Sequence, residues 1–189
     1  MDFPQYPLNL LSLANLLAGI VYLHGGKGMQ SDPPGLDSDD VLVGGPGRDV
    51  LLGTLGDDLL KGGKGDDLLA DSGGRNTMVG GPGDDIFLFA PDVSRPGAAF
   101  NRIKDFTPGE DVIGLAFDLP GVSPGSLGKA YFHKGKAAAE HDHHVVYDRK
   151  SGKIFFDADG AGGDAHFKVA KVDPGTKLHA DDFMILPLG

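Results

Sequence analysis

The chain has 189 residues, of which 40% are hydrophobic, so it is long enough to bury a core. Its 31 glycines and 13 prolines exclude a fold dominated by long helices, and the absence of cysteine excludes disulfides and thiolate metal sites. A formal net charge of −10 without a strong basic cluster argues against a nucleic-acid partner and favours cations.

Residues 8–23 form the only long apolar run. The run is too short for a comfortable membrane span, and it lacks the basic leader and cleavage pattern of a secretory signal. Its few polar residues recur every three or four positions, which predicts a helix with one polar face: Asn9, Ser12, Asn15 and Gly19. The favoured interpretation is a helix that covers an exposed end of the core; the alternative is a helix that meets a partner or a membrane surface.

A nine-residue repeat begins at Gly35 and runs without a gap for six rows, to residue 88. The sixth position holds a carboxylate or amide in every row: Asp40, Asp49, Asp58, Asp67, Asn76 and Asp85. The eighth position holds a large apolar residue in every row: Leu42, Leu51, Leu60, Leu69, Met78 and Phe87. A flexible linker would share the composition but not the phase, so the repeat predicts stacked structural units.

Each row combines glycines with a short apolar segment. Glycines at the first, second and fourth positions permit left-handed or crowded backbone, in a tight turn that points carbonyl groups inward. The apolar segment suits a brief strand with its eighth residue facing inward. Stacking such units would bury the eighth-position residues as a continuous ladder.

The repeat window, residues 35–88, contains 11 aspartates and 4 lysines or arginines, a net charge of −7. Stacked turns would bring sixth-position carboxylates close together, where like charges destabilise each other. Calcium removes that repulsion because it accepts six to eight oxygen ligands, backbone carbonyls included, whereas magnesium demands stricter octahedral geometry. The repeat therefore predicts bound Ca²⁺.

The rows resemble the G-G-x-G-x-D-x-U-x nonapeptide of the RTX (hemolysin-type) family. This resemblance implies an all-β fold, a right-handed parallel β-roll in which two rows make one turn and calcium lies between turns. Asp40, Asp58 and Asn76 would then line one edge, and Asp49, Asp67 and Asp85 the other. The resemblance also implies carbonyl ligands from turn glycines: Gly45, Gly47, Gly56, Gly62, Gly63, Gly65, Gly80, Gly81 and Gly83.

Some rows depart from the family pattern. Asn76 lacks the charge, its row begins with Asp71 instead of glycine, and the first row has Ser38 at its fourth position. About four calcium ions are expected in the roll. The intervals Asp49–Asp67 and Asp67–Asp85 should bind strongly, and the intervals Asp40–Asp58 and Asp58–Asn76 more weakly.

The chain changes character from Phe89 onward. Segments 101–115, 145–172 and 180–186 resemble the region that follows the roll in serralysin-type proteases and related exported RTX proteins, although Asn101 replaces the usual aspartate. Residues 148–152 have the composition of a hairpin turn between two strands. The expected organisation is a helical cap or linker at 1–34, the roll at 35–88, and a β-rich capping and secretion region at 89–189.

Four further aspartates are candidate calcium ligands. Asp105 and Asp111 could close the last site of the roll. Asp157 and Asp159 belong to a turn that is either solvated or a supplementary calcium site, and its glycine spacing is not that of an EF-hand loop.

Three other motifs carry no predicted chemistry. Residues 121–125 match G-x-S-x-G, but Pro124 has no N–H for an oxyanion hole. The histidine cluster at 140–144 alternates into a strand and is interpreted as a polar edge, with transition-metal binding as the alternative. Residues 62–65 lack the Ser or Thr of a phosphate loop.

The sequence thus predicts a non-catalytic, calcium-binding module of a secreted or cell-surface protein that folds outside the cell. The expected partner is a type I secretion apparatus, which would read a signal near the C-terminus. No membrane span and no nucleic-acid partner are expected, and a protein or surface partner could meet the N-terminal helix. The alternatives are the C-terminal portion of an RTX enzyme, of protease or lipase type, and an adhesin-type surface protein.

Overall fold

The structure is a computed structural model that describes residues 39–53, 55–71, 73–90, 101–116, 122–136, 143–157 and 166–186. The predicted helix at 8–23, Asp159 and His141 lie outside the described residues. Among those described, no helix is long and apolar enough to span a bilayer.

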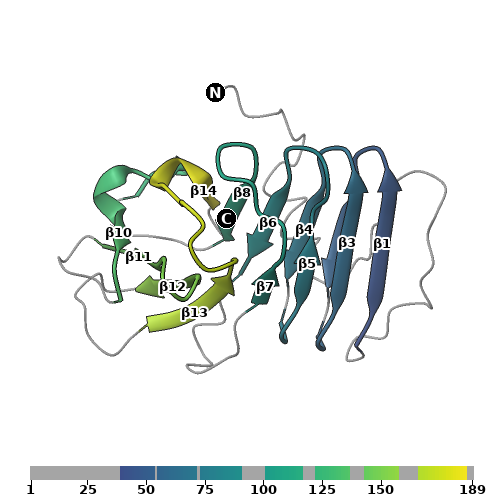
Figure 1. Cartoon of the computed structure of the whole chain (residues 1–189), viewed down its shortest axis with the longest axis horizontal. Helices are drawn as coiled ribbons and strands as arrows, with labels where there is room; N and C mark the ends of the chain where they lie inside the picture. Colours follow the sequence, from purple (N-terminus) through teal and green to yellow (C-terminus); the bar gives the residue numbers. More distant parts are fainter. Residues whose placement is uncertain are drawn as a thin grey trace.

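The six rows fold into two stacks of parallel strands, and Figure 1 shows the strands of the repeats succeeding one another from β1 toward β7 and β8 along the molecule. One sheet contains β1 (Val41–Pro46), β3 (Leu59–Lys64) and β5 (Thr77–Val79), and the other contains β2 (Val50–Gly53), β4 (Leu68–Asp71) and β6 (Ile86–Phe89). Leu42 pairs with Leu60, and Leu51 pairs with Leu69, so partners lie 18 residues apart. This register confirms that two rows make one turn of a parallel β-roll.

The eighth-position residues form the core between the two sheets. All six are at most 1% exposed and belong to one cluster: Leu42, Leu51, Leu60, Leu69, Met78 and Phe87. The predicted apolar ladder is therefore confirmed. At the C-terminal end of the ladder, Phe87 contacts Phe106 with ring centroids 6.0 Å apart.

Both sheets continue beyond the repeats. β7 (Asn101–Ile103) pairs with β5, and β8 (Val112–Ala116) pairs with β6, each in parallel. The first sheet then adds β13 (His166–Lys171), β12 (Lys153–Asp157), β11 (Val145–Asp148) and β10 (Phe132–Lys134); the second adds β14 (Phe183–Leu186) and β9 (Gly125–Ser126). The antiparallel pairing of β11 with β12 confirms the hairpin predicted at 148–152. The short 3-10 helices η1 (Lys129–Tyr131) and η2 (Ala180–Asp182) complete the described elements.

Candidate metal centre

The sixth-position side chains are fixed by the backbone of the preceding turn. The N–H of Asp49 donates to Oδ1 of Asp67 at 2.8 Å, and the N–H of Asp67 donates to Oδ1 of Asp85 at 2.9 Å. The N–H of Asp85 continues the series to Oδ1 of Asp111 at 3.0 Å. One oxygen of each carboxylate is therefore held in place along this edge, which we call the Asp67 edge.

The opposite edge, which we call the Asn76 edge, repeats the arrangement. The N–H of Asp40 donates to Asp58 at 2.9 Å, that of Asp58 to Asn76 at 2.7 Å, and that of Asn76 to Asn101 at 2.8 Å. The structure thus brings the predicted sixth-position residues together in two series, one on each edge. Each series ends on a residue of the C-terminal region.

The second oxygen of the sixth-position aspartates accepts no hydrogen bond in four rows. Within the described part of the chain, these buried Oδ2 atoms belong to Asp49, Asp58, Asp67 and Asp85. A buried, unsatisfied charged oxygen is costly, and repeating it at one position of the turn favours a cation that neutralises the charge.

Carbonyl oxygens converge on the same places as these unpartnered carboxylate oxygens. A Cβ added at Gly62 would lie closer than 3.0 Å to both Oδ2 of Asp67 and the carbonyl oxygen of Gly80. A Cβ at Gly44 would similarly meet Oδ2 of Asp49 and the carbonyl oxygen of Gly62. The first-position glycine therefore leaves room where a carboxylate and a carbonyl of neighbouring turns meet, and these hard oxygen donors fit Ca²⁺.

The second- and fourth-position glycines make the turns themselves possible. Gly63 has φ +126°, and a Cβ there would collide with the carbonyl group of Gly45 in the turn before it. The predicted glycines at these two positions all have positive φ: Gly45, Gly47, Gly56, Gly63, Gly65, Gly81 and Gly83. Gly62 and Gly80 do not, and their constraint is the crowding at Cβ.

No group of three or more His, Asp or Glu side chains in the described ranges is arranged to hold a metal ion. A cation here would consequently depend on backbone carbonyls for much of its coordination. That donor set is acceptable to calcium and poor for transition metals, which prefer imidazole or thiolate ligands.

Burial raises the pKa of these carboxyl groups above the ordinary value. It raises the pKa of Asp85 to about 7, with the negative charges of Asp111, Asp67 and Asp105 adding to the effect. Burial likewise raises the pKa of Asp67 to about 6, with Asp49 and Asp66 contributing repulsion. Without a cation, the Asp67 edge therefore holds carboxylates that resist ionisation.

The last turn of the Asp67 edge is closed by two residues from outside the repeats. Asp111 accepts from Asp85 through Oδ1 and from the N–H of Thr107 through Oδ2 at 2.7 Å. Asp105 accepts from the N–H groups of Gly80 and Gly81 at 3.0 and 2.9 Å. Both aspartates lie at the predicted position and organise the turn backbone; direct ligation of calcium by either remains a prediction.

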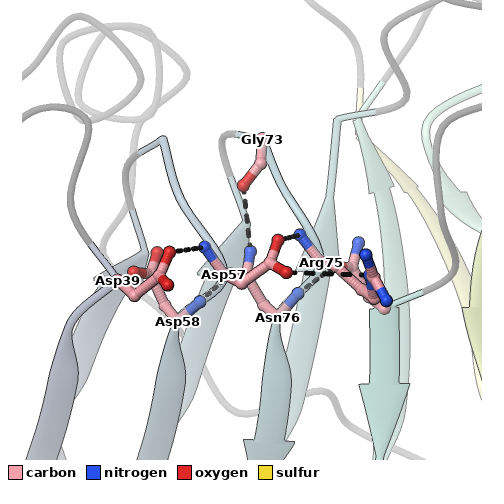
Figure 2. A network of polar contacts seen from close by, with 7 residues as sticks. Asp39, Asp57, Asp58, Gly73, Arg75 and Asn76 are labelled. Carbon is pink, nitrogen blue, oxygen red and sulfur yellow. Dashed lines mark hydrogen bonds and ion pairs between the residues drawn. The ribbon is translucent and has the colours of Figure 1, made fainter.

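The turn at Asn76 is organised differently. Oδ1 of Asn76 accepts from the backbone, so its Nδ2 occupies the branch that carries Oδ2 in the aspartates. This Nδ2 donates to the carbonyl oxygen of Gly73 at 3.2 Å (Figure 2). It also donates to Oδ1 of Asp71. Nδ2 of Asn101 donates to the other oxygen of Asp71 at 2.9 Å. Asp71 occupies the first position, where other rows have glycine, and is 7% exposed.

These three residues form a side-chain network, which we call the Asp71 lock. The missing charge of Asn76, the missing glycine and the unusual Asn101 are separate departures in the sequence, and their connection was not predicted. The signal was available, since all three departures fall on one edge. An amide N–H directed into this turn opposes a cation between Asp58 and Asn76.

A second series of hydrogen bonds joins residues at the fifth position of the rows, and it was not predicted from the sequence. The N–H of Asp57 donates to Asp39 at 2.7 Å, and that of Arg75 donates to Asp57 at 2.9 Å (Figure 2). Arg75 also forms an ion pair with Asp57 at 3.7 Å, and on the other edge the N–H of Asp84 donates to Asp66 at 3.1 Å. Here each side chain accepts from the following turn, opposite to the sixth position, so adjacent aspartates tie each turn to both neighbours.

The other candidate ligands, Asp157 and the histidines near it, lie in the C-terminal region. Asp157 is buried at the end of β12, and its backbone pairs with His144, whose Nδ1 lies 2.8 Å from the carbonyl oxygen of Asp157. His144 is 8% exposed, and its ring contacts the backbone through this hydrogen bond. The rings of His133 and His143 are in contact, with centroids 4.6 Å apart.

Comparisons with known proteins agree with this geometry. The family model of the RTX calcium-binding nonapeptide repeat (4 copies) matches residues 34–69 and again 52–87. The solution structure of the AlgE6R3 subunit from the Azotobacter vinelandii mannuronan C5-epimerase is similar at 28% identity, with a TM-score of 0.51, covering 84% of this chain and 85% of that one.

Two further results concern the rest of the chain. The PE-PPE domain model matches residues 1–49 and so overlaps the first rows of the repeat. A comparison with curated proteins finds no match.

Fold and site together define a parallel β-roll whose turns present oxygen ligands for calcium. The repeat region of this chain matches the family model of RTX calcium-binding nonapeptide repeats and is similar to a solved repeat structure of an epimerase.

Proposed function

We propose that calcium binding drives the folding of this chain, and that it serves as a non-catalytic module of an exported protein. The observation that supports this most strongly is the series of buried, unpartnered Oδ2 atoms facing carbonyl oxygens of neighbouring turns. Without a cation these oxygens make the folded roll costly; with one they become its main cross-links between turns.

The preference for calcium over magnesium follows from the ligands. The carbonyl oxygens come from a backbone whose turns are stacked 18 residues apart, so their positions cannot adjust to a small octahedral ion that keeps its waters. At a free concentration ten times its dissociation constant, each bound ion would stabilise the folded chain by about 1.4 kcal/mol.

Circular dichroism of the full chain in chelator, in magnesium and in calcium tests this proposal. We expect a transition from coil to β structure in calcium alone. A chain equally folded in chelator and in millimolar calcium would disprove calcium-driven folding.

A matched pair of substitutions tests the assigned ligand. Asp67→Asn keeps Oδ1, which accepts from the N–H of Asp49, but replaces the buried Oδ2 by an amide nitrogen. Asp66→Asn makes the same chemical change at the neighbouring residue, whose side chain is less buried. We expect calcium affinity to fall at least tenfold for Asp67→Asn, about 1.4 kcal/mol or more, and to change little for Asp66→Asn. Equal effects would mean that the total negative charge of the turn, and not the buried Oδ2 of Asp67, determines calcium binding.

Export through a type I secretion apparatus is part of the proposal. It is supported by the resemblance of segments 101–115, 145–172 and 180–186 to the region that follows the roll in exported RTX proteins. Co-expression with such a transporter should carry the chain to the medium, and a variant lacking residues 180–189 should remain in the cell. Equal secretion of both would contradict a C-terminal signal.

The second candidate function is the C-terminal portion of a longer RTX protein that carries its own activity elsewhere. The match of residues 1–49 to the PE-PPE domain model favours it, since a second domain family reaches into the start of the roll. An antibody against the roll, applied to cells that produce the protein, should then detect a species larger than 19.7 kDa. A single species at that mass would favour the module alone.

A further inference from the structure

Like charges face one another on the first sheet. Lys171 of β13 pairs with Arg102 of β7 on one side and with Lys153 of β12 on the other. Side chains paired across strands point to the same face, so these cations form a row over adjacent strands at about 4.8 Å spacing, which we call the cationic row. Like charges opposite one another destabilise a sheet, so the cationic row is unexpected in a chain with a net charge of −10.

The cationic row points away from the core. The strand neighbours of its members belong to the core cluster: Ile103, Ile154 and Ala170. Because successive side chains of a strand point to opposite faces, the cationic row lies on the outer face of the first sheet. The side chain of Arg102 is accordingly 50% exposed, so a partner can reach it.

Further cations widen the cationic row into a patch. Lys61 of β3 follows a buried leucine, Lys104 directly follows β7, and Lys168 of β13 pairs with Phe155, whose neighbours on β12 lie in the core. Lys61, Lys104 and Lys168 are all exposed. We call the whole patch the basic face: Lys61, Arg102, Lys104, Lys153, Lys168 and Lys171.

Acidic residues are scarce on this sheet. Among the described residues, the acidic residues of its strands are Asp148 and Asp157. Asp157 is buried, whereas Asp148 pairs with Lys153 at the border of the basic face. Just beyond β13, Asp173 lies 3.9 Å from Arg102. The cations of the basic face therefore outnumber the acids beside them.

Aliphatic side chains share the outer face of the first sheet with these cations. Val43, Leu59 and Val79 are partly exposed, and Val41 is 51% exposed. Each lies next to an eighth-position residue of the core, so it points outward. Binding to a lipid surface draws on both kinds of residue, because apolar area is buried at the headgroup boundary and cations are attracted to anionic lipids.

We propose that the basic face binds the surface of an anionic lipid bilayer. A flat sheet allows all of its cations to approach a planar array of headgroups together, and each Lys or Arg near such a surface strengthens binding about fivefold. The sixth-position aspartates lie in the turns at the two edges, not on this face. Salt screens the repulsion between these aspartates and the lipid beyond about 10 Å.

A second copy of the chain fits the basic face less well. In such a copy, Asp66 and Asp84 offer fifth-position carboxylates at the spacing of adjacent turns, which matches part of the cationic row. An exposed ion pair strengthens association about fivefold at most, and two aspartates can meet only two cations. A bilayer, in contrast, offers an anion to every cation of the basic face.

Sedimentation with lipid vesicles tests the proposal on the full chain in calcium. Vesicles of phosphatidylcholine alone are compared with vesicles that contain an equal amount of phosphatidylglycerol. We expect the chain to sediment with the mixed vesicles only, and to be released as salt rises from about 0.1 M to about 1 M, where the Debye length falls from about 10 Å to about 3 Å. Equal binding to both kinds of vesicle, or binding to neither, would overturn the proposal.

Matched variants separate the basic face from calcium that bridges carboxylates to lipid. Arg102→Gln with Lys171→Gln removes two members of the cationic row and should lower the vesicle partition coefficient by more than about tenfold. Lys129→Gln with Lys177→Gln removes the same charge from exposed positions outside the first sheet and should leave the coefficient nearly unchanged. Equal losses in both variants would assign binding to net charge, and no loss in either would assign it to calcium bridging; each result would overturn the proposal.

Circular dichroism of the same samples keeps this inference distinct from calcium-driven folding. Both variants should gain β structure in calcium, because neutralising opposed like charges relieves repulsion. If the chain proved to be folded already in chelator, calcium-driven folding would be wrong, and the vesicle experiment would be repeated in chelator, where calcium cannot bridge carboxylates to lipid.

Two further measurements distinguish other occupants of the basic face. Sedimentation velocity without lipid would reveal self-association, and its loss in the variant with Arg102→Gln and Lys171→Gln would assign the face to a second copy. Binding of soluble dextran sulfate without binding to the mixed vesicles would assign the face to a soluble polyanion. Either result would overturn the bilayer as the partner.

Discussion

At the residue scale, a sixth-position aspartate performs two tasks with two oxygens. In Asp67, Oδ1 accepts a backbone N–H from the preceding turn, which fixes the side chain, while Oδ2 is left for a cation. Asparagine can perform the first task but not the second. This explains how Asn76 stays in the hydrogen-bonded series on its edge although it lacks the charge that calcium requires.

The raised pKa values predict how the calcium-free chain responds to pH. Burial raises the pKa of Asp67 to about 6 and that of Asp85 to about 7, from 3.8 when unperturbed. The folded state therefore binds more protons than the unfolded state between about pH 4 and pH 7, and its stability falls as pH rises through that window. Circular dichroism in chelator should accordingly show a chain that is coil at pH 8 and gains β structure as the pH falls to 5.

Calcium-induced folding should depend on pH in the opposite direction and become weaker on acidification. Because calcium binds the ionised carboxylates, acidification should raise the calcium concentration at the midpoint of folding as pH falls from 8 to 6. Titrations monitored by circular dichroism at several pH values provide the measurement. A midpoint independent of pH would indicate that the carbonyl oxygens, and not Asp67 and Asp85, dominate binding.

At the element scale, the Asp71 lock ties the turn of Asn76 to β7 without a metal ion. Asp71→Ala would remove the acceptor for the side-chain amides of Asn76 and Asn101 inside the protein. We expect a loss of about 1–3 kcal/mol in the free energy of unfolding, measured by denaturant titration in calcium. Calcium affinity of the Asp67 edge should change little, which distinguishes the lock from a calcium ligand.

Replacing the Asp71 lock by the residues of a regular turn should create calcium sites. Asp71→Gly, Asn76→Asp and Asn101→Asp together restore the glycine and carboxylates that the other turns possess. We expect calorimetry to show more calcium bound per chain than in the unmodified protein, and folding to become more dependent on calcium. The single change Asn76→Asp serves as the control, since the carboxylate of Asp71 would still fill the turn. If the triple variant bound no more calcium ions per chain than the unmodified protein, the idea that the Asp71 lock takes the place of a calcium site would be wrong.

The sequence was most informative where the repeat is regular. A fixed phase of nine residues was sufficient to predict the buried ladder. The resemblance to the RTX nonapeptide implied the 18-residue register and the grouping of Asp49, Asp67 and Asp85. Neither was sufficient for the Asp71 lock, because Asn101 lies outside the repeat and its distance from Asn76 has no periodic signal.

At the scale of the whole molecule, the roll and the C-terminal region share both sheets. β5 and β6, the last strands of the repeat, pair with β7 and β8, and the sheets continue from there to β10 and β9. The hydrogen-bonded series also cross this junction, since Asn76 donates to Asn101 and Asp85 donates to Asp111. The C-terminal region therefore supplies the last turn of each edge.

Deletion of residues 100–189 should consequently abolish calcium-induced folding of the repeats. It would leave the edges of β5 and β6 unpaired, expose Phe87 by removing Phe106, and take the acceptors from the N–H groups of Asp85, Gly80 and Gly81. Such open ends of a stacked array are costly and prone to association.

Deletion of residues 1–30 is the informative comparison for that truncation. It leaves both edges and their C-terminal closure intact, so the calcium-induced transition should persist. Loss of the apolar segment that the sequence predicts as a cap should expose Leu42 and Leu51 at the open end of the roll and promote association. Circular dichroism with calcium, together with light scattering, would separate the two effects. If the chain ending at residue 99 folded as a monomer with full calcium affinity, the repeats would close their own end, and the continuity of the sheets into the C-terminal region would have no bearing on calcium-dependent folding.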